Sequence, residues 1–517
     1  MHENSLQASR YYRWIVLGIV MVGTFMVILD SSIVNVALPH MMSAFGVNRD
    51  QIEWVSTSFM LTMAVVMPLV GWMVGRFGHK ALYLSALALF TVASAACAFS
   101  WSYNALIVAR VAQAIGCGAI QPVGMALVAE LFEPHERGKA LGIWGTGIMV
   151  APALGPTFGG YLTDTFSWRT IFSINLPIGL LAFLVAAAVM RSEAGAARRK
   201  VPFDYWGFAF LSMALISGLL ALSQGQEEGW DSRLVHVCLG FTIVGLVMFL
   251  GIESSVEHPI LPLSLFRCRN FSLSIGLAVF RAVGLFGSIF LLPIFLQNMA
   301  GYTTIQTGLW MMPGAVAVGL TMPIAGRLAD RYGPRWLVVI GTTLTGVSLV
   351  QYGQLDPLSD ALMIIGPQVT RGVGLALMMA PLLAAALNSV PKERVATASS
   401  FLNVAQSVGG SFGIALLNTY VTNAVQRHAV GIGELVGAQT QTLERFTQHV
   451  SGVAFRGAHG VLLSDQAKGA ALSAQAVFHK ASVMGFENGF VLGGLIVLAG
   501  LPLCLMLKPS PHHKVPP

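Results

Sequence analysis

An acidic and a basic side chain stand inside two long apolar stretches of this chain. Asp30 lies within residues 13–38, and Arg110 lies within residues 105–129. A charge at the centre of a membrane-spanning helix costs about 3 kcal/mol or more, so such residues usually face the interior of a helix bundle and pair there. At a rise of 1.5 Å per residue, Asp30 lies roughly 13 Å and Arg110 roughly 9 Å below the outer ends of their helices. These depths allow the two side chains to meet.

A buried carboxyl group next to a guanidinium group can do proton chemistry. The positive charge of Arg110 favours the ionised form of Asp30, whereas the loss of water favours the neutral form. These opposing effects suit a group that takes up a proton on one side of a membrane and releases it on the other. We therefore predict that Asp30 couples transport to protons and that Arg110 tunes it. A permanent structural ion pair between the two helices is the alternative.

Two further arginines occupy mid-helix positions, Arg281 and Arg371, and an internal repeat makes Gln113 the counterpart of Arg371. Three mid-helix arginines against one aspartate favour amphipathic anions, weak acids or neutral compounds over dications as ligands. Flexible methionine and aromatic side chains suit varied ligands, although they are also ordinary lipid-facing residues. We predict that the substrate cavity is lined by Asp30, Arg281, Arg371, Gln113, Met63, Phe286 and Trp310.

The composition indicates a polytopic membrane protein. Of 517 residues, 55% are hydrophobic and 10% are charged, whereas soluble domains carry about 25% charged residues. The sequence pI near 9.3 does not indicate nucleic acid as a partner, because Lys and Arg are scattered between apolar stretches. The five cysteines form neither a CxxC pair nor a disulfide framework. We expect no metal and no cofactor.

The sequence contains no nucleotide-binding loop of the GxxxxGK[ST] type and no HExxH or GxSxG motif. ATP is therefore not the expected energy source, and we do not expect an enzyme.

Apolar stretches of about 20 residues predict an all-α protein with fourteen membrane-spanning helices. Short loops on one side hold nineteen Lys and Arg residues and those on the other side hold three, which predicts that both termini are cytoplasmic. No cleavage site follows the first apolar stretch, so we expect it to be retained as a span. The predicted spans are residues 13–38, 52–74, 81–100, 105–129, 139–162, 170–190, 204–224, 235–254, 271–297, 306–328, 336–354, 361–389, 397–421 and 485–507.

The chain also repeats itself. MPLVGWMVGRFGHK (67–80) matches MPIAGRLADRYGPR (322–335) at a spacing of 255 residues, and RVAQAIG (110–116) resembles QVTRGVG (368–374) at a spacing of 258. Paired halves of this kind are typical of transporters that rock around a site at the membrane midplane. We predict a six-helix bundle at 1–190, two inserted helices at 191–260 and a second six-helix bundle at 261–517.

The first repeated motif, GRLADRYGPR in its complete form, joins two helices through a short loop. Its glycines permit a tight turn and close helix approach, and its aspartate can accept hydrogen bonds from an arginine or from a helix N-terminus and so hold one end of the protein closed. The first copy has Gly75 in place of the acid, and a basic loop that serves only topology is the alternative. The predicted gating residues of the two copies are Gly71, Arg76, Gly78, Gly326, Asp330, Arg331 and Gly333.

The chain resembles the major facilitator superfamily, in particular the fourteen-helix drug:proton antiporters of the EmrB/QacA type, and it looks closest to the EmrB branch. The resemblance implies a proton-coupled multidrug efflux transporter that exports amphipathic toxic compounds by alternating access. A lipid, lysophospholipid or fatty-acid flippase of the same fold is the alternative. Departures from the family pattern are Gly75 and Arg281. The motifs that carry the resemblance are LDSSIVNVALP (29–39), RVAQAIG (110–116), GIMVAPALGPTFGG (147–160), WRTIFSINLPIG (168–179) and LFRCRNF (265–271).

The third of these motifs has a physical reading of its own. Small residues let another helix pass closely, and prolines bend a helix by removing backbone hydrogen bonds. We predict a hinge and seal between the two halves, although ordinary glycine-rich packing is the alternative. Its residues are Gly147, Pro152, Gly155, Pro156, Gly159 and Gly160.

A polar segment at about 422–484 separates the last two predicted spans and reads as amphipathic helices outside the membrane. The resemblance implies that it lies on the periplasmic side of a bacterial inner membrane. There it would face a membrane-fusion adaptor and an outer-membrane channel. A lid or spacer without a partner is the alternative.

Overall fold

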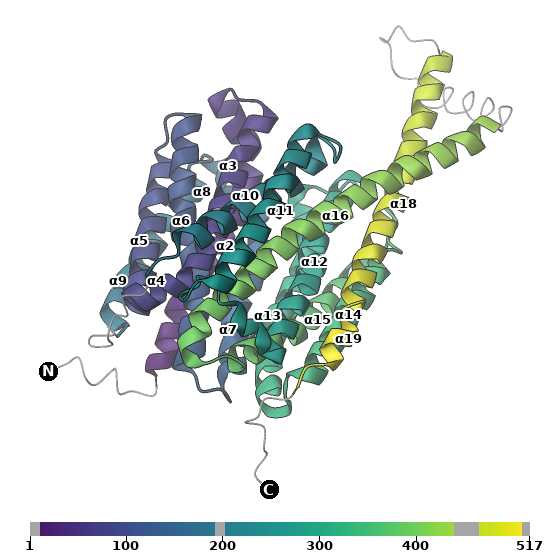
Figure 1. Ribbon diagram of the computed structural model, residues 1–517. Helices are drawn as coiled ribbons and strands as arrows, with labels where there is room; N and C mark the ends of the chain where they lie inside the picture. Colours follow the sequence, from purple (N-terminus) through teal and green to yellow (C-terminus); the bar gives the residue numbers. More distant parts are fainter. Residues whose placement is uncertain (1–10, 192–201, 439–464, 509–517) are drawn as a thin grey trace.

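The computed structural model describes residues 11–191, 202–438 and 465–508, and all regular structure in these ranges is helical. The predicted all-α class is confirmed. The first described residues and the last ones lie at the same end of the molecule, the lower end in Figure 1. The opposite end is called the upper end below.

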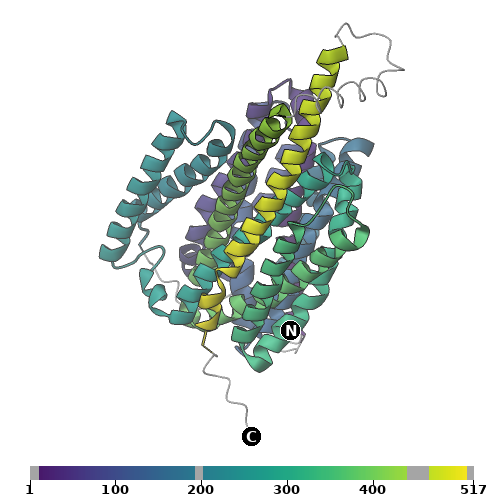
Figure 2. The ribbon, with the colours of Figure 1, turned by 90° about the vertical axis from the view of Figure 1, so that its right-hand side faces the viewer.

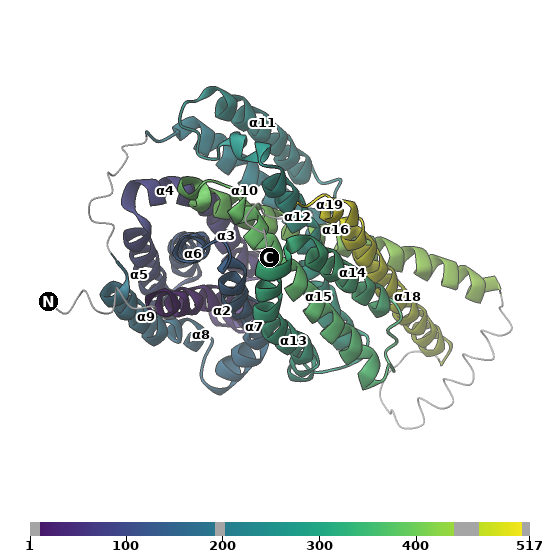
Figure 3. The ribbon, with the colours of Figure 1, turned by 90° about the horizontal axis from the view of Figure 1, so that it is seen from below.

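The first bundle occupies one side of the molecule (Figure 3). A 3₁₀ turn at Met67–Leu69 joins its second and third helices, and a single residue, Ile174, separates its last two. Its helices are α2 (Tyr12–Phe45), α3 (Arg49–Val66), α4 (Val70–Phe77), α5 (His79–Ala98), α6 (Tyr103–Leu131), α7 (Arg137–Thr165), α8 (Thr170–Ser173) and α9 (Asn175–Val189).

The second bundle lies beside the first (Figure 3). Between them in sequence, α10 (Tyr205–Glu227) and α11 (Arg233–Ser255) pack against each other at the edge of the two bundles, where α10 contacts α3 and α16. The boundaries at residues 190 and 260 stay a prediction. The helices of the second bundle are α12 (Arg269–Asn298), α13 (Thr304–Tyr332), α14 (Pro334–Tyr352), α15 (Ala361–Asn388), α16 (Val395–Ala438), α18 (Asp465–Leu498) and α19 (Leu501–Leu505).

The predicted number of fourteen spans is not confirmed. Within the described residues, twelve helices are long and apolar enough to cross a membrane, and the bent α7 makes a thirteenth when it is counted as one span. The predicted span at 336–354 coincides with α14, which is long enough, at 19 residues, but is not among the sufficiently apolar helices. Its sequence includes three threonines and begins with a proline and an arginine.

The repeat extends to local geometry. Capping boxes begin α3 at Asn48 and α13 at Thr303, which are 255 residues apart, and each satisfies backbone N–H groups that a helix start leaves free. Gly78 and Gly333, also 255 apart, hold φ of 81° and 83° with the same ψ of 163°. This left-handed region favours glycine, so both loops turn in the same way from one helix into the next.

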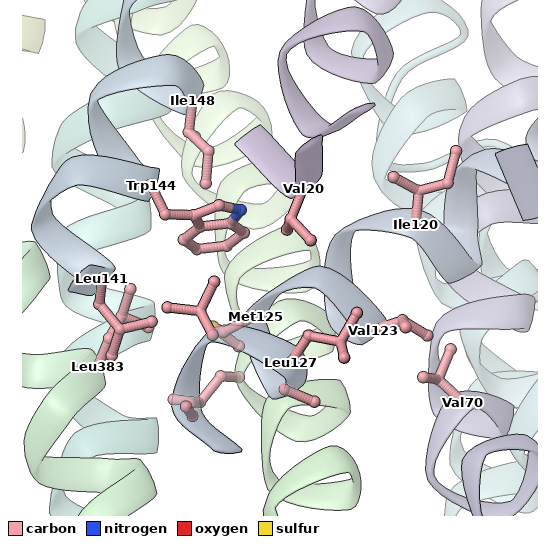
Figure 4. Packing of buried hydrophobic residues seen from close by; sticks show 14 of the residues in the cluster. Val20, Val70, Ile120, Val123, Met125, Leu127, Leu141, Trp144, Ile148 and Leu383 are labelled. Atoms are coloured by element: carbon pink, nitrogen blue, oxygen red, sulfur yellow. The ribbon is translucent and has the colours of Figure 1, made fainter. Parts of the chain in front are cut away.

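The two bundles meet through repeat-related helices. The fifth span of each half packs on the second span of the other, since α7 contacts α13 and α16 contacts α4. An apolar cluster runs across this interface (Figure 4), where Leu383 of α15 lies near Leu141 of α7. At the lower end the backbones come very close, because a Cβ on Gly326 would meet the carbonyl oxygen of Gly138.

Two helices extend past the upper end of the bundles (Figures 1 and 2). α16 runs on to Ala438 and α18 begins at Asp465, so the described parts of the polar segment at 422–484 continue the spans instead of forming separate helices. Residues 439–464 lie outside the described part of the chain.

The close approach at Gly326 yields a first prediction. A valine there must push α13 away from α7, and overpacking of this kind costs about 1–3 kcal/mol, so we expect Gly326→Val to open the lower end. Spin labels at Glu133 and Lys392, one exposed site in each half, would report a longer distance in a background without native cysteines. Gly75→Val is the matched control, because a Cβ at Gly75 meets nothing within 4 Å. An unchanged distance in Gly326→Val would contradict the expectation.

Candidate functional site

Asp30 of α2 lies at the centre of a buried hydrogen-bond network. Arg110 donates to its Oδ2 at 2.7 Å, while the side-chain amides of Gln113 and Asn175 donate to its Oδ1 at 2.9 and 2.8 Å. Arg110 also donates to Gln113 Oε1 at 2.6 Å. The structure therefore brings together Asp30, Arg110 and Gln113 from the sequence prediction, and it adds Asn175.

Further helices of the first bundle complete the network. The Nε of Arg110 donates to the carbonyl oxygen of Val55 in α3, and its guanidinium lies 4.0 Å from the ring centroid of Phe59. The amide of Gln113 donates to Ser94 of α5 at 2.8 Å. Together α2, α3, α5, α6 and α9 supply the groups around one ion pair.

The ion pair at this site is shielded from solvent. The side chains of Asp30 and Arg110 are each 1% exposed, so the pair has almost no contact with solvent in this conformation. Three hydrogen-bond donors on one carboxylate and the carbonyl that accepts from Arg110 offset part of the cost of burying the two charges.

Sequence reasoning missed Asn175, Ser94 and Val55. Asn175 offered a signal, because it is a polar residue inside an apolar helix and within a motif that carried the family resemblance. Ser94 is a small hydroxyl of a kind common in membrane helices, and Val55 contributes only its backbone. Neither could be found from residue type.

The second bundle holds a related network without an acid. Arg371 donates to Ser288 Oγ at 2.5 Å and to Gln368 Oε1 at 2.7 Å. At the spacing of 258 residues, Ser288 is the counterpart of Asp30, while Gln368 and Arg371 exchange the residue types of Arg110 and Gln113. The frame of the network is thus repeated, and a hydroxyl replaces the carboxylate.

Arg281 of α12 lies apart from both networks. It is 2% exposed, and its NH2 group donates to Gln406 Oε1 of α16 at 2.6 Å. The structure does not bring Arg281 or Arg371 into contact with Asp30. Since Ser288 of α12 follows the 258 spacing, Arg281 lies about two helical turns from this counterpart of Asp30.

The apolar residues predicted to line the cavity fall into two groups. Met63 lies 3.5 Å (Sδ to Sγ) from Cys117, and Phe286 lies against Gly410; both pack on the apolar cluster that crosses the interface. Trp310 packs with Tyr302 in a separate cluster of the second bundle. A single cavity lined by all of them stays a prediction.

The predicted gating residue Asp330 joins the two bundles at the lower end. Its carboxylate accepts hydrogen bonds at 2.8 Å from the backbone N–H groups of Gly138 and Lys139, at the N-terminus of α7. A negative charge at a helix N-terminus is stabilising. Arg137 adds a second link, donating to Asn388 Oδ1 at 2.8 Å.

The other gating residues lie around this end. Gly71 packs against Thr397 of α16, the repeat-related contact between the halves. Gly78 and Gly333 form the two turns, Arg331 is exposed with its guanidinium 5.3 Å from the ring of Tyr332, and Arg76 lies in the last turn of α4.

The glycines predicted to seal the two halves pack elsewhere. Gly147, Gly155 and Gly159 face α2 of the same bundle, and a Cβ on Gly160 would meet nothing within 4 Å. The glycines of α7 that face α13 are Gly138, Gly142 and Gly145, whose spacing of four and three residues places them on one helix face. The spacing of these three glycines is visible in the sequence.

The predicted bend in this helix is present. The two parts of α7, Arg137–Pro152 and Thr157–Thr165, meet at 47°. The carbonyl of Pro152 has no N–H partner four residues on, because that residue is Pro156, and Ser32 of α2 donates to it at 3.3 Å. The side chain of Pro156 lies outside the described part of the structure.

Comparison with known proteins is consistent across sequence and fold. Residues 20–414 match the Major Facilitator Superfamily. Multidrug export protein EmrB of Escherichia coli (strain K12) is 32% identical over 490 residues, covering 94% of each chain. The uncharacterized MFS-type transporter YhcA of Bacillus subtilis (strain 168) is 31% identical over 509 residues, covering 96% of this chain and 93% of its own.

Multidrug resistance protein Stp of Mycobacterium tuberculosis (strain ATCC 25618 / H37Rv) is 34% identical over 399 residues, covering 77% of this chain and 74% of its own. Among solved structures, the proton:xylose symporter XylE superposes with a TM-score of 0.59 at 14% identity, covering 95% of this chain and 96% of that one. The structural likeness supports the fold.

The buried pair yields a second prediction. Removing one partner of a buried ion pair costs about 3–5 kcal/mol, so Asp30→Asn and Arg110→Gln should each lower the thermal unfolding temperature strongly. The double variant should lose less than the sum of the two, and fluorescence-monitored unfolding in detergent measures the difference. The pair of Arg13 and Glu136, with side chains 26% and 32% exposed, is the control and should couple by less than about 1 kcal/mol. Equal coupling in both pairs would show that burial adds nothing at Asp30.

Proposed function

The chain belongs to the major facilitator superfamily, a family of transporters, and we propose that it is a proton-coupled exporter of amphipathic toxic compounds. It is a multi-pass membrane transporter rather than an enzyme. The relatives named for multidrug export and resistance support export of varied compounds. The observation that carries proton coupling is the enclosed pair of Asp30 and Arg110 with its three hydrogen-bond donors.

In the proposed mechanism, the network around ionised Asp30 connects five helices of the first bundle and fixes their arrangement. When a proton from outside neutralises Asp30, Arg110 loses its counterion and the network relaxes. A rocking motion then changes the side on which the site is open, and release of the proton to the other side restores the pair.

The contacts at the lower end act as the gate in this proposal. Asp330 on the N-terminus of α7 and Arg137 on Asn388 hold the two bundles together there. If the termini are cytoplasmic, this conformation is closed toward the cytoplasm, and the gate must break for a compound to enter from inside.

The extensions of α16 and α18 complete the proposal. They extend past the end opposite the chain termini (Figure 2), which is the periplasmic side if the termini are cytoplasmic and the membrane is a bacterial inner membrane. An extension of this kind offers a surface for a membrane-fusion adaptor, which would connect the exporter to an outer-membrane channel.

Proton coupling can be tested with the purified protein in liposomes that contain a pH-sensitive dye. We expect substrate-dependent proton flux in the wild type and loss of that flux in Asp30→Asn, because an asparagine binds no exchangeable proton. Exchange of labelled substrate across the membrane without a pH gradient should persist in the variant.

Glu253→Gln is the matched control, since Glu253 is a buried carboxylate of α11 outside the network whose Oε1 accepts from the N–H of Leu261. Its flux should match that of the wild type. Full flux in Asp30→Asn would make the pair structural, and absence of flux with every compound would favour the flippase alternative.

A further inference from the structure

Arg281 carries a buried charge that the protein does not balance. Its only hydrogen bond among the described residues is the one from NH2 to Gln406, and its Nε and NH1 groups have no partner there. No described Asp or Glu forms an ion pair with it. A buried charge without a counterion is among the costliest features of a fold.

A guanidinium group cannot escape this cost by losing its proton, because arginine stays protonated in proteins. The remaining ways to stabilise it are water or an anion. The planar guanidinium group matches the geometry of carboxylate, and its hydrogen bonds to anions are stronger than those to neutral groups. The free donors of Arg281 therefore fit an anionic ligand.

The position of Arg281 fits a ligand that crosses between the bundles. Its partner Gln406 lies on α16, the helix that contacts the first bundle through Ser399, whose hydroxyl donates to the Pro122 carbonyl, and through Ser407, next to Met67. One turn beyond Arg281, Leu285 belongs to the apolar cluster that crosses the interface. A motion that parts the bundles would thus expose this region.

The contrast with the first bundle identifies what is missing. Arg110 has a carboxylate partner, Asp30. Arg371 donates to the hydroxyl of Ser288 and the amide of Gln368, and within the described residues Arg281 donates only to the amide of Gln406. The first bundle is neutral at its centre and the second carries two positive charges. A ligand with an acidic group would supply the missing negative charge.

We propose that Arg281 and Gln406 form the subsite that binds the acidic group of an amphipathic anion, a carboxylate or sulfonate. The apolar part of the ligand lies along Phe286 and the neighbouring cluster. This assignment deepens the proposed function, on which it rests, by naming the substrate class and the residues that select it.

The sharpest test replaces Gln406 by glutamate. Glutamate has nearly the same shape and supplies a permanent counterion to Arg281 at the position of Gln406 Oε1, 2.6 Å from NH2, so it should compete with any anion. The probe is tritiated 2-naphthoate, and its neutral and cationic counterparts are 2-naphthamide and 2-naphthylmethylammonium. Binding is measured on the full chain in detergent without a proton gradient, so failure of proton coupling does not affect the result.

We expect the wild type to bind naphthoate more tightly than naphthamide or the ammonium. Gln406→Glu and Arg281→Gln should each weaken naphthoate binding by about 10- to 100-fold, the size expected for hydrogen bonds to a charged group, and should leave naphthamide binding unchanged. Unfolding temperatures no lower than that of the wild type would show that both variants fold.

Gln368→Glu is the matched control, because it places the same counterion beside Arg371 instead. It should leave naphthoate binding unchanged. Loss of binding in this control alone would move the anion site to Arg371 and overturn the assignment. Equal wild-type affinity for naphthoate and naphthamide, no naphthoate binding, or full binding in Gln406→Glu would also overturn it.

Discussion

The ion pair between Asp30 and Arg110 is the interaction on which the first bundle depends. Two charges that are each 1% exposed are stable only if every donor and acceptor around them is satisfied. Gln113, Asn175 and the carbonyl of Val55 meet this demand, and they come from different helices. The requirement to satisfy one carboxylate therefore fixes how several helices are rotated and how deep each one lies.

The two halves share the same helical framework but hold different polar residues at their centres. Helix caps, glycine turns and the contact between fifth and second spans recur in both halves. At the centre, however, Asp30 is replaced by Ser288, and the arginine and glutamine exchange places. A shared frame suits halves that move against each other as similar bodies, and the different polar groups are the basis for proposing a proton site in one half and a ligand site in the other.

The sequence predicted those features that depend on spacing along one helix. Depth along the helix axis was enough to predict that Asp30 meets Arg110, since each residue adds a fixed 1.5 Å. The rotation of each helix about its axis depends on its packing against several neighbours at once. For this reason Asn175 was missed, and Gly147, which was predicted to seal the two halves, packs on α2 of its own bundle.

A physical link connects the ion pair to the gate. Ser32 lies two residues after Asp30 and donates to the carbonyl of Pro152, which Pro156 leaves without its usual helical partner. That bond lies at the 47° bend of α7, and the far end of the same helix is the N-terminus that Asp330 caps. Close packing of Gly155 and Gly159 on α2 makes the two helices move together. A change in the charge of Asp30 that shifts α2 therefore acts on the bend, and the lower part of α7 transmits it to the contact that holds the bundles closed.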